Sequence, residues 1–197
     1  MFSTGVAAPL WAGHRRWSRN RIPDGLLSWM LDSGSLTDRL KSACSGQFRV
    51  QVLNERWKRP RWDENRTLGV RASTIAWVRQ VQLLCNGIPW VFARTVIPVT
   101  TLTGAQRRLA CLGSRPLGAF LFADPGMLRD PMELAPLRPG HAMFSEAVAG
   151  LDQKPGEIWG RRSVFRLRGK PLLVTEVFLP PVGGSVRKRS RYGCSRS

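Results

Sequence analysis

Hydrophobic and polar positions alternate most clearly over residues 77–98, WVRQVQLLCNGIPWVFARTVIP. The pair Asn86-Gly87 at the centre favours a type I′ turn, in which both central residues need positive φ. A two-residue turn fixes the pairing of the strands on either side of it. We therefore predict a hairpin whose facing pairs are Cys85–Ile88, Leu83–Trp90, Val81–Phe92 and Arg79–Arg94.

Two arginines facing each other at the end of an apolar face need an explanation. Like charges that lie directly opposite destabilise a sheet, and a desolvated guanidinium needs a partner. An anion between Arg79 and Arg94 would satisfy both, because the guanidinium fork fits a carboxylate or a phosphate. The alternative is that each arginine pairs with an acid elsewhere in the fold, or that the strand ends splay into water.

A second hairpin is predicted over residues 163–180, SVFRLRGKPLLVTEVFLP. With Gly169-Lys170 as a type II′ turn, the facing pairs are Leu167–Leu172, Phe165–Val174 and Ser163–Glu176. Glu176 then stands in an otherwise apolar row. A carboxyl group in such a place is a candidate for acid–base chemistry. The alternative is a structural ion pair with Arg79 or Arg94.

The remaining pattern predicts short helices, one further strand and two long loops. Asp24 is a candidate N-cap for a helix containing residues 26–31, and Ser35-x-x-Asp38 resembles a capping box. The other expected elements are a helix over 36–41, a half-buried strand at 48–52, a polar loop at 55–68 with or without a strand pairing, a helix over 105–112 ended by Gly113, a helical turn or buried strand at 116–122, and a loop over 131–157 with a helix at 142–149.

Composition indicates one globular domain with a core. The chain has 197 residues, of which 43% are hydrophobic. We expect a poorly ordered leader at residues 1–21, a folded domain at 22–181 and a basic, disordered tail at 182–197. No run reaches the ~18 apolar residues that a transmembrane helix needs, and the N-terminus does not resemble a secretory signal.

Cysteine and histidine usage bears on location and on metals. The four cysteines are scattered and form no CxxC motif, which is typical of free thiols in a reducing cytosol. We therefore expect a cytoplasmic protein. The only histidines are His14 and His141, so a metal site is not expected.

The basic charge raises the question of nucleic acid. The formal net charge is +18, and 26 of the 31 basic residues are arginine. Arginine interleaved with Trp57 and Trp62 could bind RNA through phosphates and base stacking. No helix-turn-helix, RNP, KH or zinc-finger pattern accompanies it, so we expect no specific nucleic-acid partner. Such a charge would in any case attract small polyanionic substrates.

Taken together, a series of short motifs resembles the chorismate lyase family from about Leu26 to Pro180. The motifs are Trp77-Val78-Arg79, Gly87-x-Pro89-Trp90, Ala93-Arg94-Thr95-Val96-x-Pro98, Leu102-Thr103-Gly104, Pro116-Leu117-Gly118, Leu121-Phe122, Arg129-Asp130, Trp159-Gly160-Arg161-Arg162-Ser163, Gly169-Lys170-Pro171-Leu172-Leu173-x-Thr175-Glu176 and Phe178-Leu179-Pro180. Their order, spacing and number make the match specific.

The resemblance implies a fold, a reaction and a set of site residues. The fold is α+β, with a single antiparallel β-sheet and helical flaps that cover an internal ligand site. The reaction is loss of pyruvate from chorismate to give 4-hydroxybenzoate for ubiquinone, without a cofactor or metal. The implied substrate-binding residues are Arg79, Leu117, Glu176, Arg94 and Leu36, with Arg79 and Glu176 catalytic.

Two other functions remain open. The same fold occurs as the effector-binding module of some transcription regulators, which sense a small molecule without converting it. The second is a nonspecific RNA-binding protein, an idea that depends on charge alone. We expect a monomer, because the sheet and its flaps can enclose a ligand without a partner.

Overall fold

The computed structural model describes residues 7–18 and 21–184, and its centre is one antiparallel sheet. The eight strands are arranged in the order β1-β6-β7-β8-β4-β3-β2, with β5 paired to β7 outside this path. Their bounds are β1 Ala12–Gly13, β2 Phe48–Lys58, β3 Ala76–Cys85, β4 Ile88–Pro98, β5 Met127–Arg129, β6 Glu133–Leu137, β7 Ile158–Leu167 and β8 Lys170–Phe178. The predicted α+β class with a single antiparallel sheet is confirmed.

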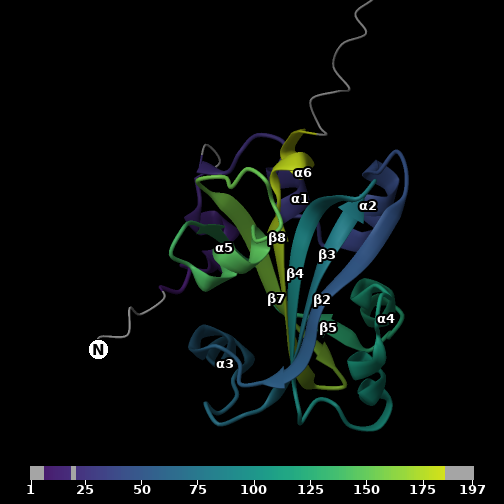
Figure 1. The fold of residues 1–197 in the computed structure, drawn as a ribbon. Helices are drawn as coiled ribbons and strands as arrows, with labels where there is room; N and C mark the ends of the chain where they lie inside the picture. The colour runs from purple at the N-terminus through teal and green to yellow at the C-terminus, as the bar shows by residue number, and fades with distance from the viewer. Residues whose placement is uncertain (1–6, 19–20, 185–197) are drawn as a thin grey trace, which may run out of the picture.

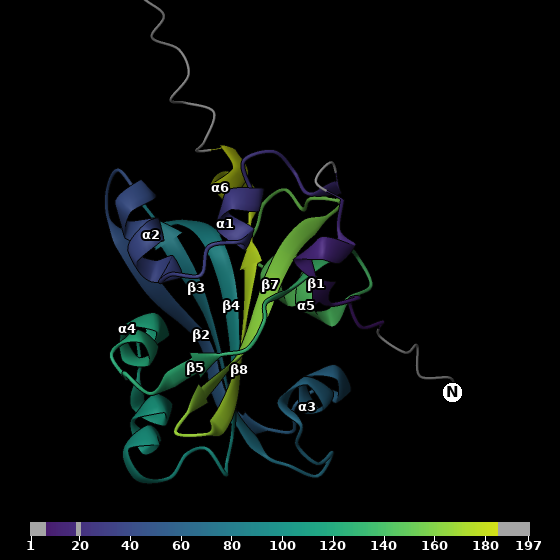
Figure 2. The ribbon, with the colours of Figure 1, turned by 180° about the vertical axis from the view of Figure 1, so that it is seen from behind.

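Short helices cover both faces of the sheet. The helices are η1 His14–Arg16, α1 Leu27–Met30, α2 Leu36–Ala43, α3 Trp62–Leu68, η3 Gly104–Cys111, α4 Leu117–Phe122, α5 Ala142–Ala147 and α6 Pro180–Gly184. In Figure 1, α2 and α4 lie on one side of the sheet, and α3 and α5 lie on the other. Figure 2 shows the same two layers from behind. The sheet therefore has two buried faces that can carry different chemistry.

The central hairpin has the predicted turn but not the predicted register. Asn86 and Gly87 adopt φ of 51° and 79°, as a type I′ turn requires. Cys85 faces Ile88, but the pairing then shifts, so that Leu83 faces Val91 and Trp90 is the extra residue of a β-bulge. Beyond the bulge Arg79 faces Thr95, and the predicted Arg79–Arg94 pair is wrong.

The second hairpin turns one residue earlier than predicted. Its turn residues are Arg168 and Gly169, with φ of 51° and 78°. Phe165 therefore faces Leu172, and Arg161 faces Glu176, in place of the predicted Ser163–Glu176 pair. The facing partner is displaced by two residues, which is one full side-chain period of a strand, so each side chain keeps its predicted face.

The N-terminal half contains more regular structure than predicted. The leader is not poorly ordered throughout, because Ala12 and Gly13 pair with β6. The prediction for 55–68 left a strand pairing open, and β2 does run to Lys58, but helix α3 takes the place of the expected loop after it. Ser35 caps α2 as predicted, with the Asp38 backbone N–H donating to its Oγ at 3.3 Å, and α2 continues to Ala43. The first helix begins later than expected, with Leu26 rather than Asp24 at its N-cap.

The C-terminal half follows the expected outline with local differences. The helix predicted over 105–112 is a 3₁₀ helix, and the ambiguous segment at 116–122 is helical. The region 131–157 contains strand β6 as well as helix α5, because Glu133–Leu137 pairs with β7. Residues 182–184 of the predicted tail belong to helix α6, and the rest of that tail, from residue 185 onward, lies outside the described residues.

A disulfide corrects the prediction of free thiols. Cys44 follows α2 directly and bonds to Cys85 at the end of β3. Cys111 is free and exposed, and Cys194 lies outside the described residues. Within the part of the chain that the structure describes, no helix is long and apolar enough to cross a membrane.

Candidate active site

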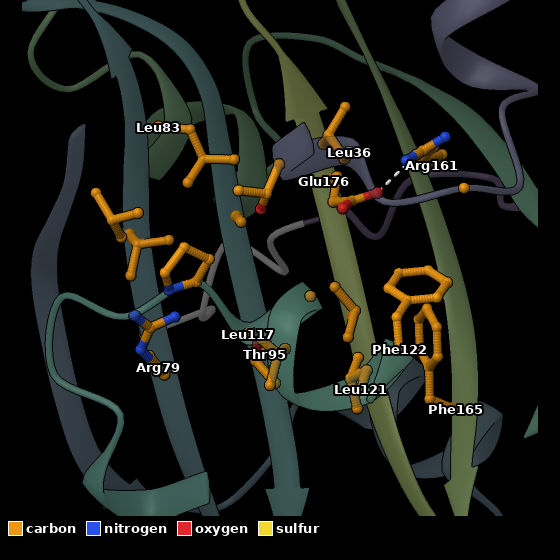
Figure 3. A pocket seen from close by; sticks show the side chains of 18 of the residues that line it. Leu36, Arg79, Leu83, Thr95, Leu117, Leu121, Phe122, Arg161, Phe165 and Glu176 are labelled. Carbon is orange, nitrogen blue, oxygen red and sulfur yellow. Dashed lines mark hydrogen bonds and ion pairs between the residues drawn. The ribbon is translucent and has the colours of Figure 1, made fainter. Parts of the chain in front are cut away.

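A cavity lies between the sheet and the helices α2 and α4, and Figure 3 shows it from close by. The space between atoms within its outline, part of which is open to solvent, is about 580 Å³. Most of its walls are apolar, and the charged groups are three arginines and one glutamate. The lining side chains from the sheet are Val50, Arg79, Val81, Leu83, Ala93, Thr95, Arg129, Arg161, Phe165, Val174 and Glu176, and the flaps add Leu36, Thr37, Pro116, Leu117, Leu121 and Phe122.

Arg79 is held rigidly at one side of the cavity (Figure 3). Its Nε donates to Glu55 Oε1 at 2.8 Å, and its Nη2 donates to the carbonyl oxygens of Gly113 and Arg115 at 2.7 and 3.2 Å. Burial lowers the pKa of Arg79, and the hydrogen bond and charge of Glu55 oppose this shift. Nη1 has no hydrogen bond to any described residue, so it can donate to a ligand in the cavity.

Glu176 lies at the opposite side of the cavity, beside Arg161 (Figure 3). Arg161 Nε donates to Glu176 Oε2 at 2.6 Å. Arg161 Nη1 donates to the carbonyl oxygens of Trp29 and Asp32 at 2.8 and 2.6 Å. These bonds fix one carboxylate oxygen and leave the other, Oε1, without a hydrogen bond to the described residues. Glu176 is thus oriented by Arg161, and neither Arg79 nor Arg94 is its partner.

Arg129 is the third arginine of the lining and comes from β5. Its Nε donates to Ser163 Oγ at 3.1 Å, and its Nη1 donates to the Ser33 carbonyl oxygen at 3.0 Å. The guanidinium also lies over the Phe165 ring, 5.0 Å from the ring centroid. Burial lowers the pKa of Arg129, and the like charge of Arg161 lowers it further.

The two helical flaps contribute the apolar residues that the sequence singled out. Leu36 opens α2 and Leu117 opens α4, and both are buried. Figure 3 shows both side chains at the cavity together with Leu121 and Phe122 of α4. Together the two helices and the β-sheet give the cavity a mostly apolar lining, as ligand pockets commonly have.

Arg94 lies on the other face of the sheet and does not line the cavity. Its Nε and Nη2 donate to the two carboxylate oxygens of Glu64 at 2.6 and 3.0 Å. Both side chains are almost fully buried under α3. The bulge at Trp90 is the reason, because one extra residue moves every later side chain of β4 to the opposite face.

The cavity therefore unites four of the five predicted site residues and adds two that were missed. Arg79, Leu117, Glu176 and Leu36 meet there, while Arg94 does not. Arg129 and Arg161 were missed as site residues. Both stand in the quoted motifs, but only the tertiary fold shows which arginine of an arginine-rich motif faces the cavity. Among the described residues, no group of three or more histidine, cysteine, aspartate or glutamate side chains could hold a metal ion.

Comparison with known families identifies the family of this chain. The family model described as chorismate lyase matches residues 15–188. This chain belongs to the chorismate lyase family. The family consists of carbon–oxygen lyases, so the chain is a member of an enzyme family.

Relatives in the chorismate lyase family match most of the chain. The protein named "Probable chorismate pyruvate-lyase" in Aromatoleum aromaticum is 45% identical over 85% of this chain and 91% of its own length. A protein of the same name in Methylococcus capsulatus is 44% identical over 79% of this chain and 94% of its own length. One in Pseudomonas putida is 36% identical over 96% of this chain and 98% of its own length.

Solved structures of other proteins, a transcription regulator among them, share the fold. PhnF from Mycobacterium smegmatis superimposes with a TM-score of 0.56 at 12% identity, over 77% of this chain and 66% of that one. A GntR-family regulator from Bacillus cereus gives a TM-score of 0.51 at 10% identity, over 77% of this chain and all of that one. At these identities the likeness shows that this chain and the two solved structures share a fold, and it shows nothing about function.

Proposed function

We propose that this protein converts chorismate to 4-hydroxybenzoate and pyruvate, as a step toward ubiquinone. The observation that carries the proposal is the cavity itself, an apolar chamber with Arg79 at one side and a positioned carboxylate, Glu176, at the other. Chorismate is a small cyclic dianion that needs both a cationic anchor and an acid–base group. Membership of the chorismate lyase family supports the same reaction.

Binding of the ring is assigned to Arg79 and the flaps. The free Nη1 of Arg79 donates to the ring carboxylate, and a hydrogen bond between charged groups is about twice as strong as a neutral one. Leu36 and Leu117 cover the ring and exclude water, which strengthens every electrostatic interaction inside. Arg79 already has Glu55 and two carbonyl partners, so its guanidinium is positioned before the substrate arrives.

Proton transfer is assigned to Glu176. In the elimination, the ring carbon that bears the hydroxyl loses its hydrogen as a proton. The bond from the neighbouring ring carbon to the enolpyruvyl oxygen breaks, and the released enolate gains a proton to become pyruvate. The ring electrons become aromatic, so no oxidant or reductant is required. Glu176 is the one carboxylate among the described residues that line the cavity, and Arg161 fixes its orientation.

The test is the activity of a Glu176→Gln variant. Removal of a positioned acid–base group typically lowers the rate by ~10²–10⁴-fold. We expect kcat for chorismate, followed by the absorbance of 4-hydroxybenzoate, to fall within this range while thermal unfolding shows a folded protein. Glu157→Gln is the matched control, because Glu157 lies outside the cavity and pairs with Arg21 and Arg138. A Glu176→Gln enzyme with normal kcat would contradict the assignment.

A sensor of small molecules is the second candidate function. It is favoured by the structural likeness to GntR-family transcription regulators. A sensor would bind 4-hydroxybenzoate tightly and leave chorismate unchanged. A lyase would consume chorismate and release stoichiometric pyruvate, which lactate dehydrogenase detects. The same purified protein therefore distinguishes the two functions in one pair of assays.

A further inference from the structure

The charges around the cavity do not balance, and the imbalance lies at Arg129. Arg79 pairs with Glu55 at 2.8 Å, and Arg161 pairs with Glu176 at 2.6 Å. Arg129 has no carboxylate within ion-pair distance among the described residues. Among the described residues, the cavity therefore carries one uncompensated positive charge beside Glu176.

The nearby acids are already paired with other arginines. Asp32 and Glu176 are the carboxylates whose charges act on Arg129. Asp32 Oδ2 accepts from Arg39 Nη1 at 2.7 Å, and Glu176 accepts from Arg161. Among the described residues, Arg129 donates its hydrogen bonds to neutral oxygens alone, those of Ser163 and Ser33. Its charge is thus available to a ligand.

The position of Arg129 is fixed before a ligand binds. Ser163 holds Nε, the Ser33 carbonyl holds Nη1, and Phe165 supports one face of the guanidinium. Nη2 has no hydrogen bond to any described residue. A half-buried guanidinium held by neutral groups, with one nitrogen free, is a preformed site for an anion.

We infer that Arg129 binds the carboxylate of the enolpyruvyl group, the part of the substrate that leaves as pyruvate. This inference rests on the proposed function. The substrate has two carboxylates, and Arg79 at the opposite side of the cavity receives the one on the ring. Arg94, one of the substrate-binding residues that the family resemblance implies, is on the other face of the sheet and is bound to Glu64. Arg129 is the cavity arginine with no acidic partner.

The inference separates substrate from product. Once the carbon–oxygen bond breaks, the second carboxylate belongs to pyruvate, and 4-hydroxybenzoate keeps only the ring carboxylate. Arg129 should therefore contribute to the binding of chorismate and not to that of 4-hydroxybenzoate. Arg79 should contribute to both. No purely structural role of Arg129 would divide the two ligands in this way.

The experiment measures both affinities by calorimetry in a Glu176→Gln background, in which chorismate stays intact. Loss of one partner of a desolvated charge pair weakens binding by about 30-fold or more. We expect Arg129→Gln to raise the Kd of chorismate by at least this factor and to change the Kd of 4-hydroxybenzoate by about twofold or less. Arg129→Lys, which keeps the charge but not the fork, should fall between. Arg79→Gln should weaken both ligands.

Arg166→Gln is the matched control. Arg166 lies on β7, where it pairs with Asp130 next to Arg129, and it does not line the cavity. This variant should change neither affinity. It therefore shows whether an effect of Arg129→Gln comes from the lost charge or from a disturbed contact between β5 and β7. If Arg129→Gln fails to fold, the Arg129→Lys variant supplies the same comparison.

The outcomes distinguish this inference from the proposed function. Equal weakening of both ligands by Arg129→Gln, or no weakening of either, overturns the inference while the lyase activity of the unmodified protein stands. Absence of turnover in the unmodified protein overturns the proposed function, and the two affinities still decide whether Arg129 recognises the second carboxylate. Failure of the unmodified cavity to bind chorismate overturns both.

Discussion

Glu64 and Arg94 form a buried ion pair that supports the sheet from the side opposite the cavity. Glu64 is 1% exposed and Arg94 is 2% exposed. Burial raises the pKa of Glu64, but the hydrogen bond and charge of Arg94 outweigh it, so that the pKa lies below its usual value of 4.5. The same glutamate also accepts from the Arg61 backbone at the start of α3. It thus joins α3 to the strand β4.

We predict that Glu64→Gln destabilises the fold by about 3–5 kcal/mol at pH 7, because it leaves Arg94 buried without a counter-charge. Glu64 binds a proton more weakly in the folded than in the unfolded chain. Its contribution is therefore complete above about pH 4.5 and is lost as pH falls through the lower folded pKa. Urea unfolding from pH 7 to 3 should show a steeper loss of stability below pH 4.5 in the unmodified protein than in the variant.

Glu133→Gln is the control for this effect. Glu133 also pairs with a buried arginine, Arg162, at 2.8 Å, but its side chain is 35% exposed. Its replacement should cost less than about 1 kcal/mol. If the two variants were equally stable, burial would not be the cause of the Glu64 effect.

The residues of the site differ in how far the sequence predicts them. Glu176 stands out from the sequence alone, because an acid in an apolar strand row is visible in the alternation. Arg79 also stands out, because it is a charged residue at the end of an apolar strand face. Arg129 has no such signal, because β5 has only three residues and the chain is rich in arginine. Which arginine lacks an acidic partner depends on contacts between distant segments.

At the scale of elements, the disulfide joins a flap to the sheet. Cys44 ends α2, whose first turn carries Leu36 and Thr37 into the cavity wall, and Cys85 ends β3. The separation of 41 residues leaves no motif in the sequence, which is why the pairing was not predicted. A cross-link of this kind restricts the unfolded chain and ties the end of α2 to the sheet.

We predict that a Cys44→Ala/Cys85→Ala double variant loses about 2–4 kcal/mol of stability, because a closed loop of this length lowers the entropy of the unfolded chain. Urea unfolding without reductant measures the difference. Cys111→Ala, at an exposed free thiol, should change stability by about 0.5 kcal/mol or less. The disulfide would be contradicted if both Cys44 and Cys85 were alkylated in the native, unreduced protein.

Strand faces were predicted better than strand partners. Val81 and Leu83 lie on the cavity face with Arg79, as the alternation indicates. The bulge at Trp90 leaves no mark on that alternation, so Phe92 and Arg94 were assigned to the wrong face. In the second hairpin the predicted pairing was wrong by two residues, so each side chain keeps its predicted face. Which residues meet in the cavity depends on the face that each side chain takes, and an error of two residues in the pairing leaves that face unchanged.

At the scale of the whole molecule, the formal net charge of +18 should affect how the substrate arrives. We predict that kcat/KM for chorismate falls several-fold when ionic strength rises from about 0.01 M to about 0.5 M, because salt screens long-range attraction. The turnover number kcat should change little. Steady-state kinetics in sodium chloride measure both constants.

A value of kcat/KM that does not depend on salt would contradict electrostatic attraction of the substrate. The same titration bears on RNA, because nonspecific association through charge should also be lost at moderate salt. The expected monomer stays a prediction, which sedimentation would test.

The single extra residue at Trp90 has a consequence for relatives of this protein. Loss of that residue, or gain of another between the turn and Ala93, would exchange the two faces of the rest of β4 and bring Arg94 into the chamber in place of Thr95. Insertions and deletions in this segment should therefore be rare, and those that survive should come in pairs. An alignment in which the segment varies freely by one residue would mean that the bulge is not what keeps Arg94 out of the chamber.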